Sequence, residues 1–396
     1  MHYLDETSIF LFLLQVAILL GLSRLFGELL RRRGQPAITG EILVGVLLGP
    51  AIFGRIAPEW QAWLFPGEAV QWTMLDSLAW LGLLLFLLKT GLETDFSAAW
   101  RQKGDALIIS TADLLIPMTI AFIPALFLPE RYMATPGQPV MFAIFIATIM
   151  TISALPVTVR VLQDLGIYKT DMGFLTVSAL TINDVAGWLI FAIVLGFLAT
   201  GGMGAGNVAY VLGATVVFAG VCLTAGRWFT GSVISAIQRK RLPEPGSSVT
   251  FICLLGLLCG AITVKIGIHA LFGFFIAGIM AGEARALSER TREVFSQIVH
   301  AILVPLFFAV IGLKIDFLEH FDPLLLGFML VVGIVGRYAG AWLGVTLSKQ
   351  PRSIRVPVSI GHLPGGEMQI VIGILALEYE VITPPVFVAI VTSAVL

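Results

Sequence analysis

The chain has 396 residues, of which 58% are hydrophobic and 12% are charged, and its mean hydropathy is +0.95. These values exclude a soluble globular domain, in which about a quarter of the residues are charged. We therefore expect an integral membrane protein, without a nucleic-acid partner. The formal net charge is −1.

Apolar stretches long enough to cross a bilayer recur along the whole chain. The first begins after acidic residues and is followed by Arg31, Arg32 and Arg33, the reverse of a cleavable signal peptide, so we expect it to be retained. The stretches predict an all-α membrane protein with about thirteen transmembrane helices, at residues 8–31, 36–54, 72–91, 105–128, 138–164, 170–200, 207–229, 248–266, 267–284, 296–315, 322–348, 353–378 and 382–396.

The basic residues of the predicted loops fall mostly on one side of the membrane. Cytoplasmic loops of membrane proteins collect Lys and Arg, whereas external loops do not. If the N-terminus is outside, the loops predicted outside carry only Arg55, Arg131, Lys265 and Lys314. An odd number of helices then puts the C-terminus in the cytoplasm, and we expect the plasma membrane of a bacterium.

Three sequence features recur in the same order in the two halves of the chain. They are a glycine pattern, a motif that ends in Asp-Phe and a Leu-Pro pair, found at Gly40, Gly45, Gly49 and Gly273, Gly278, Gly282, at 85–96 and 306–317, and at 155–156 and 363–364. Each pair lies seven helices apart, an odd number, so the two halves must cross the membrane in opposite directions. The pattern predicts an inverted repeat of helices 1–6 and 8–13, joined by helix 7.

The fifth and twelfth predicted helices contain residues that interrupt helical hydrogen bonding near their midpoints. These are Pro156 in the fifth helix and Pro364, Gly365 and Gly366 in the twelfth. Unwound backbone inside a membrane is tolerated only where it faces protein or a cavity, and matched breaks are typical of a midplane ion site. Two ordinary proline kinks are the alternative.

An acidic residue lies near the centre of the stretch 170–200, in the pair Asn183-Asp184. Placing a carboxylate at the centre of a membrane helix costs roughly 2.5–3.5 kcal/mol, so such a residue usually binds an ion, relays a proton or pairs with a buried base. Thr151 and Ser153, just before the first break, are candidates for oxygen contacts to a cation, with helix packing as the alternative.

The chain resembles, over essentially its whole length, the monovalent cation:proton antiporters, which include Kef-type potassium efflux systems and sodium/proton exchangers. The resemblance rests on the motifs at 36–50, 83–96, 151–167, 183–184, 269–283, 304–317 and 363–368. It implies that Asp184 is the shared site of cation and proton and that the two discontinuous helices cross beside it. Asn183 stands where electrogenic relatives carry a second acid, which implies electroneutral exchange.

The resemblance also implies that a single transporter membrane domain, residues 1–396, consists of parts with different roles. A core bundle would move against a dimerisation domain in a homodimer. The implied parts are dimerisation helices at 1–71 and 232–295, an ion-transporting core at 72–200 and 296–396, and a linker helix at 207–229.

Three other charges in predicted helices are expected to support the site. Arg337 matches a basic residue of the family and stays protonated, so it cannot carry the proton. We expect it to pair with Glu367 or Asp113, or to balance helix ends at the crossing. Asp113 is alternatively a proton relay. The family's Pro-Arg-Gly-Glu pattern is altered here, because Gly365 replaces the arginine before Glu367.

These observations predict a secondary active transporter that exchanges Na+ or K+ for H+ by alternating access, with the cation on Asp184. We expect no enzymatic activity and no cofactor beyond the transported ions, because no nucleophile or phosphate-binding motif stands in the predicted cytoplasmic loops. Two alternatives are a potassium efflux pathway gated by a ligand through a cytoplasmic regulatory domain, and a membrane sensor that does not transport.

Overall fold

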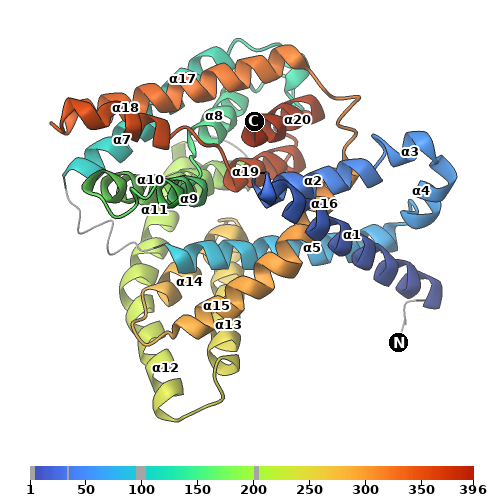
Figure 1. The fold of residues 1–396 in the computed structure, drawn as a ribbon, viewed down its shortest axis with the longest axis horizontal. Coiled ribbons are helices and arrows are strands. Elements are labelled where there is room, and N and C mark those ends of the chain that lie inside the picture. The colour runs from blue at the N-terminus through green and yellow to red at the C-terminus, as the bar shows by residue number, and fades with distance from the viewer. Residues whose placement is uncertain (1–4, 34, 95–103, 200–204) are drawn as a thin grey trace. The chain divides into compact units, whose positions relative to one another are not determined.

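The structure, a computed structural model, describes residues 5–33, 35–94, 104–199 and 205–396. Nearly all of this part is helical (Figure 1), and its β-structure is limited to an isolated bridge between Met133 and Ile382. The side chains of a few described residues, Pro156 and Glu367 among them, lie outside the described part.

The helices follow the predicted stretches in order. They are α1 (Glu6–Arg32), α2 (Ala37–Leu48), α3 (Phe53–Ile56), α4 (Pro58–Leu64), α5 (Ala69–Glu93), α7 (Asp105–Ala125), η1 (Glu130–Tyr132), α8 (Pro139–Thr151), α9 (Leu155–Asp164), α10 (Asp171–Ala199), α11 (Ala205–Val221), η2 (Cys222–Gly226), α12 (Arg227–Arg239), α13 (Gly246–Lys265), α14 (Ala270–Gly282), α15 (Glu289–Ile298), η3 (Val299–Leu303), α16 (Val304–Lys314), α17 (Pro323–Leu347), α18 (Arg352–Gly361), α19 (Glu367–Glu378) and α20 (Pro384–Val395).

Each of the thirteen predicted stretches contains helix, which confirms the all-α fold. In the described part of the chain, nine helical segments are long and apolar enough to cross a membrane. Four others are shorter apolar helices, within α8, α14, α19 and α20. Two of these four are halves of the interrupted helices, and a half-helix is too short to span alone. The count of thirteen crossings therefore stays a prediction.

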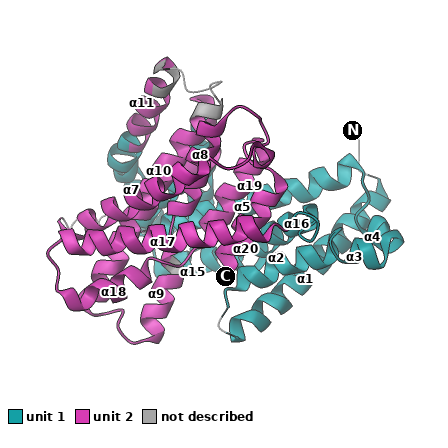
Figure 2. Ribbon diagram, turned by 90° about the horizontal axis from the view of Figure 1, so that it is seen from above, with its two compact units in different colours: residues 1–93, 220–263, 273–320 teal, residues 94–219, 264–272, 321–396 magenta. Residues whose placement is uncertain are grey.

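The chain forms two compact units (Figure 2). Unit 1 comprises residues 1–93, 220–263 and 273–320, and unit 2 comprises residues 94–219, 264–272 and 321–396. Unit 1 includes α5 and α16, which lie in the predicted ion-transporting core, whereas α7–α10 and α17–α20 lie in unit 2. The division into dimerisation domain and core stays a prediction.

Unit 1 shows the repeat as two closely packed helix pairs, α2 with α16 and α14 with α5. A Cβ added at Gly45 would lie 2.7 Å from the Cα of Gly312, and one added at Gly278 would lie 2.9 Å from the Cα of Gly91. Real side chains do not approach a backbone this closely, so both crossings need glycine. Each contact joins one helix of the first half to one of the second, and the corresponding helices exchange places in the two contacts, as the inverted repeat predicts.

Unit 2 is organised around the contact between α7 and α17, which run side by side (Figure 1). Glycines of α17 spaced four residues apart lie on the face that meets α7. A Cβ at Gly340 would lie 3.0 Å from the Cα of Asp113, and one at Gly344 would lie 2.7 Å from the Cα of Ile109. This small-residue face brings α17 close enough for its next polar residue, Arg337, to reach the interior of the unit.

Candidate functional site

The two predicted helix breaks are confirmed, and both lie in unit 2. Residues 152–154 separate α8 from α9, and residues 362–366 separate α18 from α19. The two unwound segments are joined directly, because Ala154 N donates to the Pro364 carbonyl at 2.8 Å and Ser153 Oγ donates to the His362 carbonyl at 3.0 Å. These are discontinuous helices that meet at their breaks, so the alternative of two ordinary proline kinks is wrong.

Glycine lets the two breaks approach. A Cβ added at Gly366 would lie 2.5 Å from the Cβ of Ala154, a contact that real side chains do not make. One added at Gly365 would lie 2.6 Å from Gln369 Oε1 and 3.2 Å from Arg337 Nη1. The run of glycines after Pro364 therefore has two roles, since it interrupts the helix and it leaves room for the partner segment and for the arginine.

Arg337 holds the ends of both half-helices. Its side chain is buried, and it donates from Nε to the Met150 carbonyl, from Nη1 to the Leu363 carbonyl and from Nη2 to Gln369 Oε1, each at 3.0 Å. Met150 lies in the last turn of α8, and Leu363 follows the end of α18. The C-terminal end of a helix carries roughly half a negative charge, so the guanidinium neutralises two helix ends that would otherwise be buried together.

Arg337 was expected to pair with an acid or to balance helix ends, and the structure shows it bound at the helix ends. Its three hydrogen bonds do not include Asp113. Glu367 is the first residue of α19, and because its side chain lies outside the described part, its pairing stays a prediction.

Asp184 lies near the middle of α10 and is 7% exposed. Among the described residues, its carboxylate has no hydrogen-bond or ion-pair partner. Gly187, three residues further on and so on the same face of the helix, abuts the first break, since a Cβ there would lie 3.0 Å from Ile152 Cγ1. The carboxylate thus lies on the face of α10 that packs against the break between α8 and α9.

The neighbouring residue, Asn183, belongs to a buried polar cluster that the sequence did not reveal. Its Nδ2 donates to Asp113 Oδ2 at 2.6 Å, and His362 Nε2 lies 4.0 Å from the same oxygen. His362 Nδ1 donates to the Val358 carbonyl at 2.8 Å, which fixes the ring. All three members are almost fully buried. Asp113 was recognised as an intramembrane acid, but the expected pairing with Arg337 or relay role gave no signal for an amide from α10 and an imidazole from the second break.

The two predicted oxygen ligands are engaged in the fold. Thr151 Oγ1 donates within α8 to the Ala147 carbonyl at 2.7 Å, and Ser153 makes the link to His362 described above. Each hydroxyl oxygen retains acceptor capacity, so a contact to a cation stays a prediction for both. Pro156 lies in the first turn of α9 and Pro364 contributes its carbonyl to the link between the breaks.

Comparison with known proteins identifies similar sequences and folds. Residues 16–396 match the family model for the sodium/hydrogen exchanger transmembrane region. The chain is 27% identical to the Na(+)/H(+) antiporter NhaS4 of Synechocystis sp., over 99% of this chain and 96% of that protein. It is 32% identical to the Cation/H(+) antiporter 19 of Arabidopsis thaliana, over 77% of this chain and 38% of that longer protein. The structure of the sodium proton antiporter MjNhaP1 from Methanocaldococcus jannaschii at pH 8 has a similar fold, with a TM-score of 0.65 and 17% identity over 98% of this chain and 94% of that one.

Proposed function

Because the chain belongs to the sodium/hydrogen exchanger family, whose model matches residues 16–396, we propose that it is a secondary active transporter that exchanges Na+ or K+ for H+ around Asp184. The observation that carries this proposal is the buried Asp184 carboxylate, which lacks a partner among the described residues and lies on the face of α10 next to a helix break. An ionised carboxylate in such a place is costly unless a cation or a proton neutralises it.

Coupling follows from competition for one carboxylate. A cation binds Asp184 only when the carboxyl group has lost its proton, and a proton binds only when the cation has left. If the site changes its side of access only when it is neutralised, each cycle moves one cation one way and one proton the other way. Asn183 contributes an amide rather than a second acid, which supports a 1:1, electroneutral exchange.

Arg337 supports the site without carrying a proton. Its guanidinium donates three hydrogen bonds, to two carbonyls and Gln369, and a guanidinium stays protonated in proteins. The fixed positive charge offsets the two helix ends. The charge that changes during a cycle is therefore that of the Asp184 carboxylate, which a cation or a proton neutralises in turn.

The family supports an integral membrane location and an antiporter rather than an enzyme. The excess of Lys and Arg in the loops predicted to be cytoplasmic favours the proposed orientation, with the N-terminus outside and the C-terminus in the cytoplasm of a bacterial cell. We also propose a homodimer, formed through the helices at 1–71 and 232–295, in which the core at 72–200 and 296–396 moves. The gated potassium efflux pathway and the membrane sensor that does not transport are not favoured, since the relatives of this chain are named as antiporters.

The test uses purified protein in liposomes that contain a lumenal pH dye. Addition of Na+ or K+ should move protons in the wild type, and a voltage clamp with an ionophore should leave the rate unchanged. Asp184→Asn should abolish the signal, whereas Asp171→Asn, which removes an exposed acid at the start of the same helix, should not. Cation-driven proton movement that persists in Asp184→Asn would contradict the proposal.

A further inference from the structure

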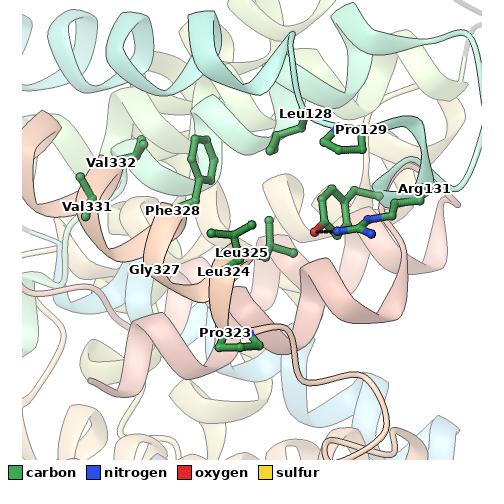
Figure 3. Close-up of a pocket in the computed structure, with 11 residues that line it drawn as sticks. Leu128, Pro129, Arg131, Pro323, Leu324, Leu325, Gly327, Phe328, Val331 and Val332 are labelled. Atoms are coloured by element: carbon green, nitrogen blue, oxygen red, sulfur yellow. Dashed lines mark hydrogen bonds between the residues drawn. The ribbon is translucent and has the colours of Figure 1, made fainter.

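Unit 2 carries an apolar groove away from the crossing of the broken helices (Figure 3). It has a volume of about 560 Å³ and lies between the segment that follows α7 and the first turns of α17. Leu128 and Pro129 form one side, and Leu324, Phe328 and Val331 of α17 form the other. α7 and α17 are both long and apolar enough to span the membrane, so the groove lies at one end of two membrane helices.

The groove has the dimensions of a lipid chain. Leu324 is 77% exposed and Val331 is 62% exposed, so apolar side chains of α17 are open to the surroundings, which in a membrane are lipid. Gly327 lies between them, and a Cβ added there would meet nothing within 4 Å, so the wall is open at this position. The groove follows α17 from residue 324 to residue 332, about 12 Å at 1.5 Å per residue, and one leaflet has a hydrocarbon depth of about 15 Å.

A polar cluster closes one end of this groove. Arg131 Nη2 donates to the hydroxyl of Tyr132 at 2.7 Å, and its guanidinium carbon lies 4.8 Å from the centre of the Tyr132 ring. The Tyr132 hydroxyl donates to Asp322 Oδ2 at 2.6 Å, and Arg131 Nη2 is 3.8 Å from that same oxygen. The groove is thus apolar along its length and ionic at its mouth, as Figure 3 shows for Arg131.

Within this cluster, Asp322 accepts more hydrogen bonds from the protein than Arg131 donates to it. Asp322 Oδ1 caps α17 by accepting from the backbone N–H groups of Leu324 at 3.0 Å and Leu325 at 3.1 Å, while Oδ2 accepts from Tyr132. Arg131 has five N–H donors, its side chain is 67% exposed, and the structure engages one donor, to Tyr132. The guanidinium therefore has donors free for a ligand oxygen at the mouth of the groove.

The charges at the mouth also define the ligand. Arg131 provides one positive charge, while Asp322 and the adjacent, exposed Glu130 provide two negative charges. A ligand with a net negative charge would meet this excess of carboxylate, whereas one with a phosphate and an ammonium group would complement both signs.

We propose that the groove binds one zwitterionic phospholipid, with an acyl chain along α17, its phosphate on Arg131 and its ammonium group near Glu130 and Asp322. The apolar wall supplies the area for the chain, and the guanidinium fixes the headgroup through charge-assisted hydrogen bonds. This site is separate from Asp184, so the proposal does not depend on the proposed transport activity.

Native mass spectrometry of the delipidated, detergent-solubilised protein tests the proposal, with phosphatidylethanolamine and phosphatidylglycerol added in turn. Phosphatidylethanolamine should bind at one site in the wild type and more tightly than phosphatidylglycerol. Arg131→Gln should weaken it by about tenfold, as expected for the loss of a charge-assisted hydrogen bond. Gly327→Leu, which fills the open wall, should weaken it at least as much. Arg131→Lys, which keeps the charge, should lose less than Arg131→Gln.

Two matched controls separate the site from general surface effects. Arg55→Gln removes a different exposed arginine, which pairs with Asp316 at 2.9 Å, and Gly213→Leu adds a side chain at another exposed helical glycine with open space around it. Both should bind phosphatidylethanolamine like the wild type. Equal binding by all variants, tighter binding of phosphatidylglycerol, or weakening by Gly327→Leu but not by Arg131→Gln would overturn the proposal. So would a dimer that dissociates in Gly327→Leu, since a second copy would then be the occupant.

Discussion

The side-chain amide of Asn183 donates a 2.6 Å hydrogen bond to Asp113, so the residue next to Asp184 is held by a carboxylate from another membrane helix. The contact links α10 to α7, and α7 packs on α17, which carries Arg337. It also fixes the direction of Asn183, because the amide nitrogen points to Asp113 and the amide oxygen points away from it. The pair Asn183-Asp184 is therefore oriented by a residue that need not touch the transported ion.

Asp113→Leu should weaken cation binding more than Asp113→Asn. The leucine leaves the buried Asn183 nitrogen without an acceptor, at a cost of about 1–3 kcal/mol, and frees the amide to rotate. The asparagine keeps an acceptor oxygen, so the hydrogen bond survives without the charge. We expect a severalfold higher KM for the cation in Asp113→Leu and a value near that of wild type in Asp113→Asn, measured in the liposome assay. An equally large change in Asp113→Asn would show that the charge of Asp113, rather than its hydrogen bond, matters.

Arg337→Lys should fail to replace the arginine although it keeps the charge. The guanidinium reaches two carbonyls and Gln369 with three separate nitrogens, a planar arrangement that a single ammonium nitrogen cannot reproduce. We expect transport to fall at least tenfold in Arg337→Lys, with a lower melting temperature, because one helix end loses its partner. Arg24→Lys in α1 provides a control arginine of a membrane helix outside the site. Wild-type transport by Arg337→Lys would show that charge alone suffices.

The sequence predicted features that depend on local chemistry. Pro364 and the following glycines cannot continue a helix, and Asp184 is conspicuous in an apolar stretch, so both could be identified without a structure. The partners could not, because they come from distant segments. Asp113 and Asn183 are separated by 70 residues, and Arg337 binds carbonyls, which every residue possesses and no sequence pattern marks. The spacing of Gly45 and Gly278 predicted a repeat, but only the fold shows that each glycine meets another glycine.

The stability supplied by Asp322 should depend on pH. The hydrogen bond from Tyr132, together with the backbone N–H groups of α17, lowers the pKa of Asp322 below its ordinary value of 3.8. A carboxyl group whose folded-state pKa is lowered stabilises the fold above its unfolded pKa, and this contribution is lost as the pH falls through the folded pKa. The melting temperature of Asp322→Asn should therefore lie below that of wild type at pH 7, and the difference should begin to shrink once the pH falls below about 4. Glu68→Gln, at an exposed acid, should melt like the wild type. A difference that stays the same size as the pH is lowered from 7 to below about 4 would assign the effect to shape instead of charge.

A pair of substitutions at the crossing tests whether the two breaks must touch. Gly366 has φ −157° and ψ −165°, extended backbone that any residue adopts, so its requirement for glycine is steric. Gly366→Ala would place a Cβ 2.5 Å from the Cβ of Ala154, and overpacking of this kind typically costs about 1–3 kcal/mol. We expect Gly366→Ala to lower both the melting temperature and the transport rate.

Ala154→Gly in the same chain should restore most of the loss, because it removes the atom that clashes. The next atom, the Ala154 Cα, would lie 3.3 Å from the new Cβ, which a small shift accommodates. The interaction energy of this double-mutant cycle then measures the contact between the breaks. Gly333→Ala is the control, since a Cβ there would lie 3.8 Å from Met150 Sδ, an ordinary contact. If Ala154→Gly leaves the defect of Gly366→Ala unchanged, the clash with the Ala154 Cβ is not its cause, and the close contact between the two breaks is not what requires glycine at this position.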